Sequence, residues 1–390
     1  MSKTARLPPP QPCWRQSRFL VPEDLIVEIL VRIPATCLIY LKRVCRSWRT
    51  LISSPEFARY QLERSIAHSD AQIAYSGDYF LQIKIGFFPL QCVLDNPSSS
   101  AKVVCVEAER HYNIVGSCNG LLCLLVRAPR STSVMLWNPC TGFTSESLQT
   151  GALIMTCGFG YDHVNHKYKF FAAMTMRTPN SQREVVSKIF TFGMNHWKTI
   201  ETSPVLFNPL DLFIVIDLRA EFVNGTLNWL IPLPNGEAVI VYLDLGMETY
   251  GELRLPERDS DDNFRIKPVI GVLRNCLSVC FDHKKTHWAV WLLNENQCWT
   301  KLALIPHYPL IVDHVFQRQC LRTLYISDDD VLLVGGQDDK LYLFYLKDGR
   351  IALPMIDSSS DDHIRLLSQG IYGRTLVVYY PSLLSPSRMV

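Results

Sequence analysis

The sequence predicts a small all-α domain followed by an all-β domain, a β-propeller of about six blades. Two observations carry this prediction. Apolar residues recur at steps of three and four through residues 19–64, whereas short apolar runs separated by turn residues begin after residue 75. We expect a disordered tail over 1–18, the helical domain over 19–64 and the β domain over 65–386. A two-sheet sandwich is the alternative for the β domain.

The segment 19–64 contains start signals for several short helices. Pro22 suits the first turn of a helix, and Glu23 and Asp24 place negative charge at the positive end of its dipole. Ser54 and Pro55 form a cap and a first helical residue, so a last helix is expected from there. Between them a second apolar series has helical spacing: Leu38, Leu41, Cys45, Trp48 and Ile52. About 45 residues rarely bury this much apolar surface alone, so the helices pack either on the rest of the chain or on another protein.

The order of residues in this segment resembles the F-box of plant proteins. The matching residues are Pro22, Glu23, Asp24, Leu25, Glu28, Ile29, Leu30, Arg32, Pro34, Leu38, Lys42, Val44, Cys45, Ser47, Trp48, Leu51, Ile52, Ser53, Pro55 and Phe57. Departures from the usual pattern are Val21, Thr36-Cys37 and Tyr40, the last of which removes a positive charge.

An F-box implies binding to a Skp-type adaptor and, through it, to a cullin. The residues that the resemblance assigns to the adaptor side are Val21, Pro22, Leu25, Ile29, Leu38, Leu41 and Trp48, some of which would also hold the small domain together.

The β domain contains a weak repeat in which a turn precedes a strand and a second apolar run follows. The repeated turns and strands are Asn119–Leu124, Asn224–Leu230, Arg274–Cys280 and Asp329–Val334. The last three are spaced by about 50 residues, the scale of a propeller blade. The gap between the first two fits a further unit over 158–200, and residues 75–115 and 370–384 would supply the first and closing blade.

Several of the same runs resemble the plant F-box-associated domain. They are Gly116–Cys123, Leu136–Gly142, Gly158–Asp162, Val223–Leu230, Trp299–Leu302 and Tyr380–Ser385. Residues 290–295 depart from the family pattern.

Together the two resemblances imply a non-catalytic substrate receptor of a cullin-based SCF ubiquitin ligase, whose β domain binds the target protein. Alternatives are an S-locus F-box receptor for self-incompatibility ribonucleases, a scaffold without ubiquitination, and an enzyme that uses the propeller channel. Loops 127–132, 177–184 and 257–265 are candidates for target binding, with Arg258 and Arg265 as guessed contact residues.

Bulk composition limits the other functions. The net charge of +2 gives no argument for nucleic acid or membrane binding, and no apolar run reaches the length of a membrane span. An odd number of scattered cysteines, 13, fits reduced thiols in the cytoplasm or nucleus.

One cluster of residues invites a metal hypothesis. Within twelve residues the sequence contains four possible zinc ligands: Cys276, Cys280, His283 and His287. The linker between the cysteine pair and the histidine pair is too short for a zinc finger. They read better as inward strand positions followed by a turn, so neither a metal nor any other cofactor is expected. Nucleophile-elbow, phosphate-loop and HExxH motifs do not occur in the sequence.

Overall fold

The computed structural model describes most of the chain, and two predicted site residues, Val21 and Arg265, lie outside the described part. The described residues are 22–68, 70–77, 83–98, 101–102, 104–108, 111–128, 131–151, 153–177, 183–194, 196–203, 218–233, 237–258, 266–308, 320–336, 340–357 and 375–385.

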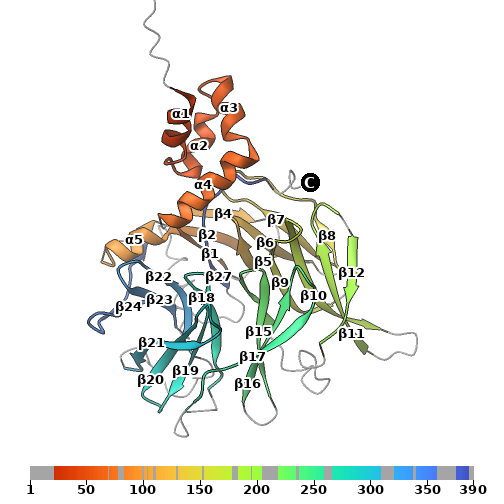
Figure 1. Cartoon of the computed structure of the whole chain (residues 1–390), viewed down its shortest axis with the longest axis vertical. Helices are drawn as coiled ribbons and strands as arrows, with labels where there is room; N and C mark the ends of the chain where they lie inside the picture. The colour runs from red at the N-terminus through yellow and green to blue at the C-terminus, as the bar shows by residue number, and fades with distance from the viewer. Residues whose placement is uncertain are drawn as a thin grey trace, which may run out of the picture.

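The N-terminal domain is helical, as predicted. Its helices are α1 (Glu23–Leu30), α2 (Ala35–Leu41), α3 (Arg46–Ile52) and α4 (Pro55–Ala67). Leu30, Leu38 and Ile52 have no exposed surface and form the centre of this domain. Helix α4 begins at the predicted cap, where the Phe57 amide donates to Ser54 Oγ (3.2 Å), and it runs from the helical domain onto the β domain (Figure 1).

The β domain is a propeller of six blades, each built on an antiparallel sheet. From the inner to the outer strand, blade 1 contains β27 (Thr375–Tyr379), β1 (Gln72–Gly77), β2 (Ile83–Pro89) and β4 (Val104–Ala108). In the same order, blade 2 contains β5 (His111–Cys118), β6 (Leu121–Ala128), β7 (Ser131–Trp137) and β8 (Leu148–Gln149). Blade 3 contains β9 (Leu153–Asp162), β10 (Lys167–Arg177), β11 (Arg183–Thr191) and β12 (His196–Ile200).

The second half of the ring follows the same plan. Blade 4 contains β14 (Glu221–Val223), β15 (Thr226–Pro232), β16 (Ala238–Asp244) and β17 (Tyr250–Arg254); blade 5 contains β18 (Val269–Leu273), β19 (Cys276–His283), β20 (His287–Leu293) and β21 (Trp299–Pro306); blade 6 contains β22 (Arg322–Ile326), β23 (Val331–Gly335), β24 (Leu341–Tyr345) and β25 (Ile351–Ala352). Helix α5 (Leu90–Asp95) follows β2, the short strand β13 (Leu218–Arg219) pairs in parallel with β9, and β3 (Ala101–Lys102) pairs in parallel with β26 (Ile356–Asp357).

The sequence repeat corresponds to the second and third strands of the blades. The repeated turns 119–120, 224–225 and 274–275 each join an inner strand to the second strand of its blade, and Asn119, Asn224 and Asn275 adopt positive φ there. The propeller prediction is therefore confirmed, and the sandwich alternative is wrong because the six inner strands contact one another in a closed ring.

Blade 1 joins the two ends of the β domain. Strand β27 pairs antiparallel with β1, from Gln72↔Tyr379 to Ser76↔Thr375, and the Tyr379 hydroxyl donates to Gln72 Oε1 (2.8 Å). Strands from the two segments that were expected to supply the first and closing blade, 75–115 and 370–384, do meet in one blade. This arrangement closes the ring with strands from both ends of the chain.

The propeller has two distinct faces. The turns that follow the inner strands lie on the face that carries the helical domain, which we call the near face, since Ser382 Oγ beside the helices donates to the Asn119 carbonyl (3.0 Å). Because adjacent strands are antiparallel, the other ends of the inner and second strands point to the opposite face, the far face.

A buried ion network ties blade 3 to blade 4 on the near face. Lys169 Nζ lies 2.8 Å from Asp162 Oδ2 and 2.8 Å from Glu248 Oε1, and it donates to the Leu245 carbonyl (2.5 Å). Asp162 has no exposed surface and Lys169 is 4% exposed. Lys198, which is exposed, also pairs with Glu248.

Inner strand β9 needs a glycine where it meets blade 4. A Cβ on Gly160 would lie 2.2 Å from Phe222 Cδ2 and 2.9 Å from Leu245 Cδ1. We expect Gly160→Ala to lower the free energy of unfolding by about 1–3 kcal/mol through overpacking, measured by chemical denaturation. Gly116→Ala on neighbouring strand β5 is the control, because the nearest atom to its Cβ is 3.9 Å away. Equal stability of the two variants would contradict this packing.

Candidate functional site

The helical domain exposes an apolar face on α1. Leu25 and Ile29, one helical turn apart, are 53% and 55% exposed, and Pro22 beside them is exposed. Exposed apolar side chains that lie next to one another can mark a surface that another protein covers. This face, formed by Pro22, Leu25 and Ile29, is the candidate docking face.

Three other residues predicted to face an adaptor lie elsewhere. Leu38 has no exposed surface, so it supports the helical domain from within and cannot contact a partner directly. Leu41 and Trp48 are half-buried and pack against the same core. The prediction for Leu38 as a contact residue is therefore corrected: its periodicity marked the inner side of α2.

Two further exposed apolar residues were not among the predicted contacts. Tyr40 on α2 is 70% exposed, and Val44 in the following turn is 61% exposed. They lie four residues apart, Tyr40 in the last turn of α2 and Val44 just after it. That spacing is the signal that could have identified them.

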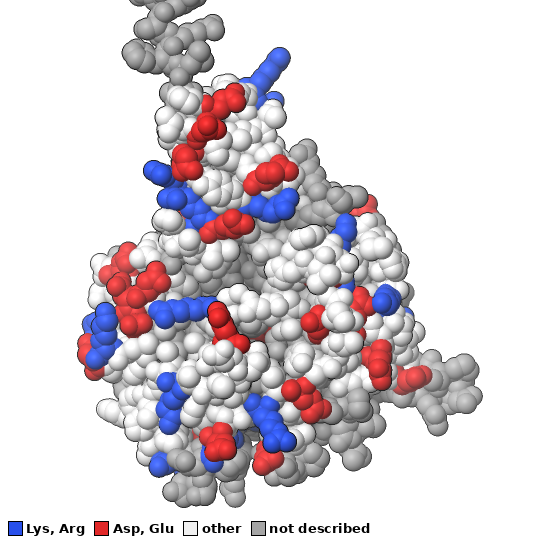
Figure 2. All heavy atoms as spheres, viewed as in Figure 1, with Lys and Arg blue, Asp and Glu red and all other residues white. Residues whose placement is uncertain are grey.

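Charge on the helical domain is mixed. Arg32 and Glu28 on α1 form an exposed ion pair (3.6 Å), and the Tyr60 hydroxyl of α4 donates to Glu28 Oε1 (3.1 Å). Acidic and basic side chains are interspersed over the visible face of the whole molecule (Figure 2). Apolar contact, more than net charge, therefore distinguishes the docking face.

A C-terminal strap, residues 381–384, ties the helical domain to the propeller. Leu383 is 7% exposed and belongs to the core of the helical domain, against which Leu384 also packs. Asn138, fully buried in the loop after β7, donates through Nδ2 to the carbonyls of Ser382 (2.9 Å) and Leu384 (2.6 Å). Cys140 from the same loop packs on the helices as well, and burial raises the pKa of its thiol to about 12.

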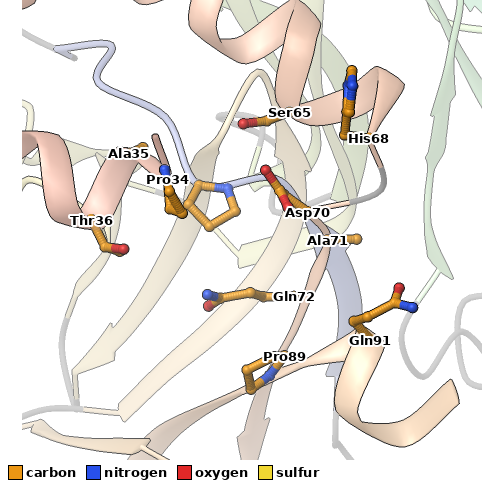
Figure 3. Close-up of a pocket in the computed structure, with 11 residues that line it drawn as sticks. Pro34, Ala35, Thr36, Ser65, His68, Asp70, Ala71, Gln72, Pro89 and Gln91 are labelled. Atoms are coloured by element: carbon orange, nitrogen blue, oxygen red, sulfur yellow. The ribbon is translucent and has the colours of Figure 1, made fainter. Parts of the chain in front are cut away.

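A shallow pocket of about 200 Å³ lies at this junction (Figure 3). Pro34, Ala35 and Thr36 line it from the helical domain, and Pro381 lines it from the strap. The side chains of Asp70 and Gln72 also face this space, from the start of the propeller. Its walls therefore come from both domains, so its shape depends on how they are held together.

The three loops predicted to bind a target have their described ends on the far face. Strands β6 and β10 end there, at Ala128 and Arg177, as does the segment after β17 that contains Arg258. The Arg258 guanidinium lies 4.9 Å from the centre of the Phe281 ring, and Phe281 is buried. Arg258 thus has a packing role that the sequence did not indicate, and its contact with a target stays a prediction.

Polar and soft side chains elsewhere in the propeller are paired or spread apart. On the inner strands, Arg322 Nη2 lies 2.6 Å from Glu221 Oε1. Cys276 and His283 stand at opposite ends of β19, roughly 23 Å apart at the usual strand rise. Within the described ranges, no group of three or more His, Cys, Asp or Glu residues is placed to hold a metal ion, and no disulfide joins the described cysteines.

Helix lengths also bear on membranes. Among the described helices, none is long and apolar enough to cross a bilayer.

Comparisons with known proteins agree with this two-part architecture. The profile of the F-box domain matches residues 19–60, and that of the F-box associated beta propeller domain matches residues 84–386. An F-box/kelch-repeat protein of Arabidopsis thaliana is 29% identical over 364 residues, covering 87% of this chain and 92% of its own length. The F-box protein CPR1 of the same plant is 24% identical, covering 85% and 83%.

Among solved structures, TolB from Acinetobacter baumannii superposes with a TM-score of 0.37 at 10% identity, over 77% of this chain and 72% of that one.

Proposed function

This chain belongs to the F-box proteins that carry an F-box associated β-propeller domain, and we propose that it is a substrate receptor of a cullin-based SCF ubiquitin ligase. The F-box docks on a Skp-type adaptor, which joins it to the cullin, while the propeller binds a target protein. The observation that carries this proposal is the docking face, where Leu25 and Ile29, one helical turn apart on α1, are both more than half exposed.

The mechanism we propose is positional. The receptor raises the effective concentration of a target lysine near a ubiquitin-charged conjugating enzyme, and it supplies no bond chemistry of its own. A rigid connection helps, since a loose one would spread the lysine over a larger volume. The strap and helix α4 together provide two connections between docking face and propeller.

We place target binding on the far face, where the described ends of all three predicted loops gather. The target class, including the ribonucleases expected for an S-locus receptor, stays a prediction. We also propose the cytoplasm or nucleus as the compartment, which the lack of disulfides among the described cysteines supports.

The test is proximity labelling in plant cells with the proteasome blocked, followed by target half-life measurements. Proteins labelled by the full chain should be stabilised when the cullin is depleted, and also in cells expressing only a chain without residues 1–64. Targets whose half-life is independent of the cullin would support the non-ubiquitinating scaffold instead. Failure of the wild-type chain to co-purify with any Skp-type adaptor would refute the proposal itself.

A further inference from the structure

The F-box of this chain is completed by residues from the opposite end of the sequence. Its core residues Leu30, Leu38 and Ile52 have no exposed surface, and Leu383 is buried in the same cluster. More than 310 positions separate Leu383 from the end of α4, the last helix of the helical domain, so this contact forms only when the chain ends have been brought together. A domain of about 45 residues has little core to spare, so one buried leucine is a large share of it.

The strap is fixed by specific backbone recognition as well as by apolar contact. Asn138 uses both sides of its amide: Oδ1 accepts from the Cys140 and Thr141 amides (2.8 and 3.2 Å), while Nδ2 donates to two strap carbonyls. On the other side, Ser382 Oγ donates to the carbonyl of Asn119.

The strap packs closely against Gly120, in the turn between β5 and β6. Gly120 adopts φ +77°, and a Cβ there would lie 2.4 Å from Ser382 Oγ and 2.5 Å from the Tyr380 carbonyl. The strap is therefore in close contact with the turn between β5 and β6, and it continues from there to Leu383 inside the helical domain.

Strand β27, which closes the ring, runs directly into the strap. Thr375–Tyr379 pairs with β1, and the next residues pass Asn119 and Asn138 before reaching the F-box core. A chain whose β27 is unpaired has no means of placing Leu383 accurately. The strand that closes the propeller and the residue that completes the F-box core are thus neighbours in one continuous segment of chain.

From these contacts we infer that the strap couples propeller closure to the docking competence of the F-box, so that a chain with an open ring has a weakened docking domain. This inference rests on the proposed function for its consequence, adaptor binding, but the coupling itself is a property of the isolated chain. The two can therefore be tested separately.

The experiment is amide hydrogen exchange on the purified full chain, with two variants. Asn138→Asp keeps the acceptor for the Cys140 and Thr141 amides but places a carboxylate oxygen against the carbonyls of Ser382 and Leu384. Leu383→Ser removes the apolar side chain that the strap contributes to the F-box core. Both should speed exchange in α1–α3 by at least roughly tenfold, while β6 and β7 keep their protection. Adaptor affinity should fall by the factor by which the folded F-box population falls.

Matched controls exist within the chain. Asn294→Asp alters an asparagine in a turn of blade 5 whose Oδ1 also accepts a hydrogen bond from a backbone amide, that of Cys298 (2.9 Å). Leu353→Ser alters a leucine that is 55% exposed. Neither control should change exchange in α1–α3.

Unchanged protection of α1–α3 in both variants would overturn the coupling. Loss of protection throughout the propeller would also overturn it, because the effect would not then be specific to the F-box. If the wild-type chain binds no adaptor, the proposed function fails, whereas the exchange result still decides whether the strap supports the F-box.

Discussion

Replacing Leu25 and Ile29 with Gln should abolish co-purification of a Skp-type adaptor without unfolding the protein. Both side chains are more than half exposed, so their loss costs the free chain little, and Gln keeps the helix propensity of α1. At an interface, apolar anchors of this kind contribute about 2 kcal/mol or more each. We therefore expect a loss of affinity of roughly a thousandfold for the pair.

Calorimetry with a purified adaptor, together with the melting temperature of each variant, measures this effect. The matched control is Val164→Gln with Met247→Gln, two exposed apolar residues (73% and 72%) in turns of the propeller. Leu38→Ala provides the opposite comparison. Because Leu38 is buried, this substitution should lower the free energy of unfolding by about 2–5 kcal/mol and should change adaptor affinity only through the loss of folded protein. Adaptor binding at full strength by the Leu25/Ile29 variant would show that the docking face lies elsewhere.

The second large effect is expected at the buried ion network. Lys169→Met leaves the carboxylate of Asp162 buried without its cation, which costs about 3–5 kcal/mol in comparable pairs. Lys198→Met is the control. Lys198 meets the same Glu248 from the exposed side, where such a pair contributes about 0–1 kcal/mol. Urea denaturation of both variants measures the difference, and equal destabilisation by both would contradict the assignment.

The pH dependence of this network has a definite sign. Burial alone would raise the pKa of Asp162, but hydrogen bonds from Lys169 and Asn165 outweigh it and hold the pKa below its usual value. The pKa of Glu248 is lowered in the same way, by Lys169 and Lys198 against the effect of burial. A lowered carboxyl pKa adds stability above the unfolded value, and that stability is lost as the pH falls through the folded value. The stability gap between wild type and Lys169→Met should therefore be widest near neutral pH and shrink below about pH 4.

Local signals in the sequence were sufficient for the order and kind of the elements. Ser54 and Pro55 marked the start of α4 because capping depends on neighbouring residues alone. The Asn-Gly turns marked blades because residues 119–120 and 224–225 need positive φ to turn the chain. The F-box and its associated domain were recognised from such runs.

The sequence did not show which apolar residues of the helical segment are buried and which are exposed. Leu25 and Leu38 have the same apolar character and similar spacing, yet one is exposed and the other fully buried, since burial depends on where the neighbouring helices lie. Lys169 gave no signal, because its partners Asp162 and Glu248 meet it only through the packing of two blades. The strap was equally hidden. Residues 380–385 were recognised as a family motif, but nothing in them indicated that Leu383 would enter the F-box.

The strap also sets the order in which the molecule would come apart under force. A force applied to the chain on the C-terminal side of the strap reaches residues 381–384 before β27, and β27 before the other strands of the propeller. Such a pull would remove Leu383 from the F-box core at the outset, and under the proposed function it would weaken adaptor binding while most of the propeller is still folded.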